Sequence, residues 1–108
     1  MTEEERITLM MKGFPKGRVP GHFKLAAEVL TNLAAELDRR GFKYQEDPYW
    51  PFHLLVRNSP RRHLSLFCGG FRRDIDIQQM KTDGTADTRF KEESFSTPKG
   101  AVNYLWKK

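Results

Sequence analysis

The chain has 108 residues and a formal net charge of +5, and thirteen of its residues are aromatic. This length suits one domain with one core, and the aromatic content excludes an intrinsically disordered chain. No apolar run approaches the roughly 20 residues that span a bilayer, and the acidic segment that begins at Thr2 is unlike a signal peptide, so we expect a cytoplasmic protein.

The first predicted element is a short helix over about residues 3–12. Thr2 and Glu5 have the spacing of a capping box, and Gly13 follows the segment, as is common where a helix ends. An edge strand is the alternative, because the apolar residues of the segment also alternate: Ile7, Leu9 and Met11. The segment is too short for its periodicity to decide between helix and strand.

A basic loop and a long helix come next. Residues 13–21 are rich in glycine and proline, which prevents a regular element, and their charged residues, Lys16 and Arg18, are both positive. Residues 22–40 then carry apolar side chains at intervals of three and four, which predicts an amphipathic helix. Gly41 ends this helix, because glycine adopts a positive φ without strain.

Beyond the long helix the apolar period changes to two, which predicts an antiparallel meander of four or five strands. A last short helix starts at Pro98, with Thr97 as its N-cap. We therefore predict a single α+β domain in which two N-terminal helices and one C-terminal helix cover one face of the sheet. The expected strands lie around residues 42–44 and at 52–57, 63–68, 74–80 and 89–95.

The sheet face opposite the core is predicted to be chemically mixed. Basic side chains beside an exposed phenylalanine suit single-stranded nucleic acid, because phosphates pair with arginine and unstacked bases pack on a flat ring. Two aspartates on this face oppose that interpretation, and the alternative is a second packing surface covered by the N-terminal segment. Period two turns the following side chains outward: His53, Leu55, Arg57, His63, Ser65, Phe67, Asp74 and Asp76.

Basic residues are segregated from acidic ones along the chain. No acid occurs between Lys12 and Lys24, and none occurs between His53 and Arg73. Such blocks favour a phosphate-bearing or acidic partner, although solubilising charge gives the same pattern. We therefore interpret the chain as a basic, non-enzymatic module that binds nucleic acid through the basic loop and an arginine-rich hairpin. The predicted contact residues are Lys16, Arg18, Arg57, Arg61, Arg62, Phe67, Arg72 and Arg73.

A protein-interaction module is the main alternative. Small inhibitors or adaptors of phage or mobile-element type bind partner proteins, and the same arginines would then meet an acidic partner. Aromatic residues dominate the hot spots of protein interfaces, although core packing explains them equally well. The candidate interface anchors are Tyr49, Trp50, Phe52 and Trp106.

A small hydrolase centred on two histidines is the third hypothesis. His53 and His63 are neighbours on the predicted hairpin, and imidazole groups titrate near physiological pH, as acid–base catalysis or metal binding requires. Asp74 and Asp76 lie on the next strand. However, the sequence contains no metal-ligand motif or nucleophile motif, and Cys68 is its single cysteine. We therefore expect no metal, no cofactor and no catalytic residue.

One part of the chain resembles the HicA-type messenger-RNA interferases. Three segments carry the resemblance: Leu33 to Phe42, Phe52 to Val56, and Leu64 to Phe67. The resemblance implies the topology of a double-stranded-RNA-binding domain and a small ribonuclease in which His53 lies near the catalytic histidine of the family. It covers under half of the chain, and Trp50-Pro51-Phe52 stands where that family has Gly-Ser-His.

Overall fold

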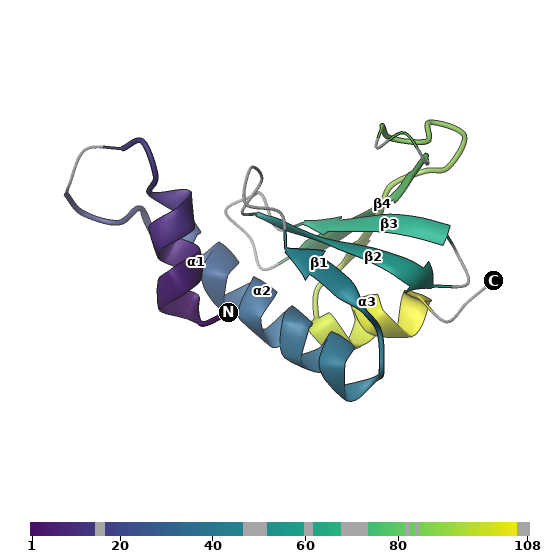
Figure 1. Cartoon of the computed structure of the whole chain (residues 1–108), viewed down its shortest axis with the longest axis horizontal. Helices are drawn as coiled ribbons and strands as arrows, with labels where there is room; N and C mark the ends of the chain where they lie inside the picture. Colours follow the sequence, from purple (N-terminus) through teal and green to yellow (C-terminus); the bar gives the residue numbers. More distant parts are fainter. Residues whose placement is uncertain are drawn as a thin grey trace.

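The structure of the chain is a computed structural model (Figure 1) that describes residues 1–14, 17–46, 52–59, 62–67, 74–81, 83 and 85–105, with the backbone alone at residues 57–59 and 62–67. The helices of this described part are α1 (Glu3–Met10), α2 (Gly21–Arg39) and α3 (Pro98–Leu105). None of them is long and apolar enough to cross a membrane. The strands are β1 (Tyr44–Glu46), β2 (His53–Ser59), β3 (Arg62–Phe67), β4 (Ile75–Met80) and β5 (Glu93–Phe95).

The N-terminal segment is a helix, and the alternative of an edge strand is wrong. The Thr2 hydroxyl accepts a hydrogen bond from the Glu5 backbone N–H at 3.1 Å, and the Thr2 N–H donates to the Glu5 carboxylate at 3.0 Å. This confirms the predicted capping box, which satisfies backbone groups that a helix start otherwise leaves unpaired. The same hydrogen bonds lower the pKa of Glu5. The helix ends at Met10, earlier than the sequence predicts.

The long helix α2 packs against α1, α3 and β2 and ends as its sequence predicts. Gly41 has a φ of +79°, which places it in the left-handed region. The chain then turns back, and the Phe42 N–H donates to the Leu37 carbonyl at 3.0 Å. One stripe of the helix is buried and consists of Phe23, Ala26, Ala27, Val29, Leu30, Leu33, Ala34 and Leu37.

The strands pair antiparallel in the order β1-β2-β3-β4-β5. The α+β class is confirmed, but the predicted meander of four or five strands needs correction. β5 is much shorter than the sequence predicts, and the β2–β3 ladder shifts register between Val56 and Ser59. Phe42, expected in the first strand, is buried in the core at 5% exposure. Of the expected strand 89–95, only Glu93–Phe95 forms, because the residues before it make a loop around Asp87.

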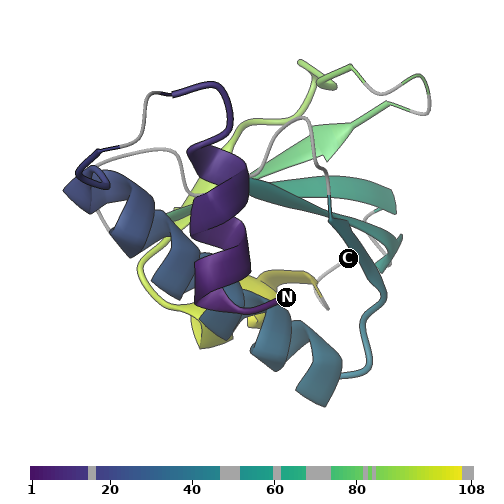
Figure 2. The same ribbon diagram turned by 60° about the vertical axis from the view of Figure 1, so that its left-hand side comes forward.

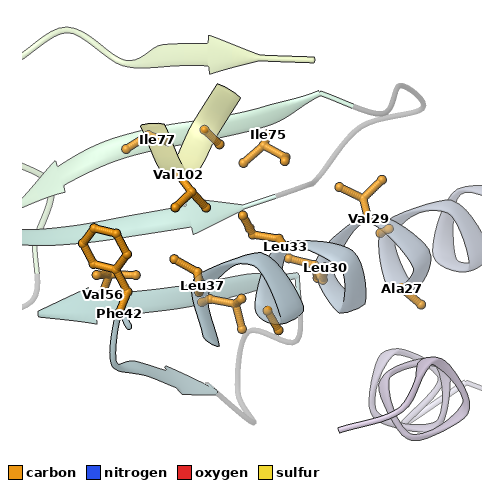
Figure 3. Close-up of a cluster of buried hydrophobic side chains, with 14 of the residues drawn as sticks. Ala27, Val29, Leu30, Leu33, Leu37, Phe42, Val56, Ile75, Ile77 and Val102 are labelled. Carbon is orange, nitrogen blue, oxygen red and sulfur yellow. The ribbon is translucent and has the colours of Figure 1, made fainter. Parts of the chain in front are cut away.

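The core fills the space between one face of the sheet and the helices α2 and α3 (Figure 3). Val102 of α3 is fully buried in this cluster together with Leu33 of α2. The predicted side chains Leu64 and Leu66 lie outside the described residues. The other predicted inward residues are buried or packed against the core, which confirms them: Phe52, Leu54, Val56, Ile75 and Ile77.

A buried arginine connects α1 to the rest of the molecule. α1 lies across α2 (Figure 2), and Arg6 of α1 is 1% exposed. Its guanidinium donates to both carboxylate oxygens of Glu46 on β1 at 2.8 Å, and its Nε donates to the Thr31 hydroxyl of α2 at 3.1 Å. A buried guanidinium requires such partners, because its desolvation is costly. The three elements are therefore joined at one side chain.

Candidate functional site

An aromatic cluster with one exposed ring lies where α1 passes to α2. Phe14 of the connecting loop is 58% exposed, and its ring contacts that of Phe23 in the first turn of α2 at a centroid distance of 5.8 Å and an angle of 78°. Phe23 is 7% exposed. It also contacts the rings of His22 at 4.7 Å and Phe52 at 5.4 Å. The cluster thus has a buried centre and an exposed outer ring.

Three exposed cations, Lys12, Arg18 and Lys24, lie near Phe14 or Phe23 along the chain. Lys12 follows α1, Arg18 precedes α2, and Lys24 is next to Phe23 in the sequence. Phe14 contacts Phe23, and the described residues of the connection between α1 and α2 lie at one end of the molecule (Figure 1). None of the three cations makes an ion pair with a residue that the structure describes. We call Lys12, Phe14, Arg18 and Lys24 the loop cluster.

The arginines elsewhere in the described chain are neutralised by carboxylates. Hydrogen bonds from Arg39 lower the pKa of Glu36, and those from Arg89 lower the pKa of Asp87 to about 2. Of the arginines with described side chains, Arg18 therefore differs in having no described carboxylate partner. The pairs are Arg6 with Glu46, Arg39 and Arg40 with Glu36, and Arg89 with Asp87.

The start of α2 adds positive potential to the loop cluster. Its N-cap residue is Pro20, which makes no side-chain capping bond, and no acid lies in the first turn. The helix dipole therefore presents its positive end near Arg18 without a compensating carboxylate. The described charges at this end of the molecule thus favour an anionic ligand.

The structure describes the side chain of only one predicted contact residue, Arg18. The backbones of Arg57 and Arg62 lie toward the β2–β3 turn, whereas Phe52, which contacts Phe23, directly precedes β2. About 15 Å of extended strand therefore separates Arg57 from the start of α2, and these backbones are not beside Arg18. The backbone of Phe67 is paired with that of His53, at the other end of the strand. Four predicted residues lie outside the described part: Lys16, Arg61, Arg72 and Arg73.

The described side chains on the outer face of the sheet are partly buried. The predicted outward residues with described side chains are partly buried, namely His53, Leu55, Asp74 and Asp76. Asp76 accepts a hydrogen bond from the Ser94 hydroxyl across β4 and β5. The N-terminal helix packs against α2 (Figure 2) and is engaged there through Arg6. The described part of this face thus carries little positive charge.

The described residues show no arrangement of side chains that supports the catalytic or the protein-interface hypothesis. No three metal-ligating side chains come together within the described part of the chain. The side chain of His63 lies outside it, so a histidine pair with His53 stays a hypothesis. Among the predicted interface anchors, Phe52 packs against the core, as the alternative explanation requires. The other anchors fall outside the described residues: Tyr49, Trp50 and Trp106.

Comparison with protein-family models, curated proteins and solved structures finds no match to this chain. The resemblance of residues 33–67 to HicA-type interferases therefore gains no support from a family match. Any function must be argued from the residues of the chain itself.

Phe14, the exposed ring of the loop cluster, is not among the contact residues predicted from the sequence. The sequence pattern predicts positive charge for residues 13–21 and a stacking aromatic at Phe67 instead. A signal for Phe14 does exist in the sequence. A phenylalanine between Gly13 and Pro15 lies in no periodic element that could turn it toward the core.

Proposed function

We propose that this protein is a non-enzymatic nucleic-acid-binding module whose contact surface is centred on the loop cluster. The proposal retains the predicted basic loop and Arg18 and adds Lys12, Phe14 and Lys24. The arginine-rich hairpin over β2 and β3 would form a separate contact region, because its backbone turns at the far end of β2.

The observation that best supports this proposal is the contrast in charge compensation. The other arginines with described side chains are held by carboxylates, whereas Arg18 makes no ion pair with a described residue. Phosphates bind to such cations by releasing condensed counterions, which makes the affinity depend on salt. The positive end of the α2 dipole adds to this attraction.

Binding of labelled oligonucleotides at rising salt tests the proposal. With about three phosphate contacts, we expect the logarithm of the association constant to fall with the logarithm of salt at a slope of about −2 for single strands. The variant K12E/R18E/K24E should lose this binding. Each reversal removes two charges, so the formal net charge changes from +5 to −1.

A matched control separates a local site from a general charge effect. The variant K81E/K91E/K99E reverses three other exposed lysines and changes the net charge by the same amount. We expect it to retain most of the binding. Equal loss in both variants, or binding that does not change with salt, would contradict the proposal. Retention of a protein partner after nuclease treatment, without oligonucleotide binding, would favour the protein-interaction alternative.

A further inference from the structure

We infer that the loop cluster takes single-stranded nucleic acid and stacks one unpaired base on Phe14. This inference rests on the proposed function and adds the class of nucleic acid and the residue that selects it. It is carried by the exposure of Phe14, by its contact with the buried Phe23 and by the exposed cations close to it in the chain.

Phe14 is both exposed and held in place. Its side chain is 58% exposed, which is more than the other exposed large hydrophobic residues of the described part, Met1 and Phe90. Its ring contacts Phe23 nearly perpendicularly, at 78°, so this contact leaves a face of Phe14 uncovered. Phe23 is itself buried and packed against His22 and Phe52. A ring with such support loses little freedom when a ligand stacks on it.

Phe90 is a second exposed phenylalanine, and its ring has different neighbours from that of Phe14. It is 45% exposed, but the Arg89 guanidinium lies over its ring at 5.8 Å from the centroid. Arg89 is in turn held by Asp87, so its charge is compensated. Phe90 therefore has a compensated guanidinium over its ring where Phe14 has the edge-to-face contact with Phe23, and Phe90 serves as the internal control for Phe14.

An exposed aromatic ring distinguishes single strands from duplexes. In a duplex both faces of each base are covered by neighbouring bases, whereas an unpaired base can pack on an aromatic side chain. Lys12, Arg18 and Lys24 would hold the phosphates on either side of that base. Phosphate contacts alone would bind a duplex as well, so the selectivity is assigned to Phe14.

The test compares an oligothymidylate of about twelve nucleotides with a duplex of the same length at fixed salt, using fluorescence anisotropy. We expect Phe14→Ala to weaken single-strand binding about tenfold and to leave duplex binding unchanged. Phe14→Leu, which keeps an apolar contact to Phe23 without an aromatic face, should weaken it similarly. Phe14→Trp should retain binding, and Phe90→Ala should leave it unchanged. Circular dichroism verifies that each variant is folded.

The outcomes separate this inference from the proposed function. If the protein binds single strands and duplexes equally and Phe14→Ala reduces neither, the inference fails while the proposed function stands. The inference also fails if Phe14→Leu binds as tightly as the wild type, because a flat ring is then unnecessary. If neither nucleic acid binds, or if binding does not change with salt, the proposed function itself fails.

Discussion

Asp87 illustrates how a single carboxylate organises the loop between β4 and β5. It is 4% exposed and accepts hydrogen bonds from the Arg89 side chain at 2.7 and 2.9 Å and from its backbone at 3.2 Å. The Gln78 amide donates to the backbone carbonyl of Asp87 at 3.3 Å. The residues before β5 thus satisfy their polar groups without a ladder, which is why the predicted strand is shorter here.

The Asp87 pair should make stability depend on pH. The Arg89 hydrogen bonds lower the pKa of Asp87 from 3.8 to about 2. Because the pKa is lower in the folded protein, the contribution to stability is present above pH 3.8 and disappears as the pH falls toward 2. We expect Asp87→Asn to lower the melting temperature at pH 7, and the difference from wild type to shrink toward pH 2.

Asp74→Asn provides the reference for this measurement, because it removes an aspartate outside the loop. Thermal unfolding followed by circular dichroism at several pH values gives the comparison. A difference between wild type and Asp87→Asn that stayed constant down to pH 2 would show that the carboxylate does not act through its charge.

At the level of elements, the end of α2 determines where the sheet begins. Gly41 has a φ of +79°, and no atom beyond its chain neighbours lies within 4 Å of the position that a Cβ would take. A substitution there would therefore be strained by the backbone alone. The turn that follows brings Phe42 into the core and starts β1 at Tyr44.

Gly41→Ala should lower the free energy of unfolding by about 1 kcal/mol, because alanine tolerates a positive φ poorly. Gly21→Ala is the matched control. Gly21 also has an open Cβ position but no positive φ, and it starts α2, where alanine is a good helix former. We expect its stability to be unchanged or slightly raised. Urea denaturation of both variants measures the contrast, and equal effects would refute the conformational explanation.

At the level of the whole molecule, α1 is held by Arg6 as well as by apolar packing. The Arg6 guanidinium reaches Thr31 of α2 and Glu46 of β1, which lie 25 and 40 residues further along the chain. Sequence patterning did not single out Arg6, although it lies four residues before the buried Met10 on the same helical face. Arg6 thus joins α1 to both α2 and β1.

Glu46→Gln should therefore destabilise the protein by about 2 kcal/mol, because it leaves the buried Arg6 without its counter-charge. The value is below that of fully buried pairs, since the Glu46 side chain is 30% exposed. The exposed Glu92 lies in no helix or strand, and Glu92→Gln should have little effect. Urea denaturation compares the two variants. If they unfold at the same urea concentration, the ion pair adds no measurable stability.

The local elements of this protein could be derived from the sequence. The capping box of α1, the length of α2, its glycine end and the Thr97 cap of α3 all depend on residues within a few positions of one another. The alternation of inward residues in β2 and β4 is equally local, because the strand period is fixed by backbone geometry. These features need no knowledge of distant contacts.

Tertiary structure alone decided the features that depend on residues far apart. It buried Arg6 against Glu46, moved Phe42 from a strand into the core, and replaced part of a strand by the Asp87 loop. It also packed Phe14 on Phe23 and left the loop cations without described partners. Burial and ion pairing depend on which surfaces meet across the fold, and no local pattern of residues contains that information.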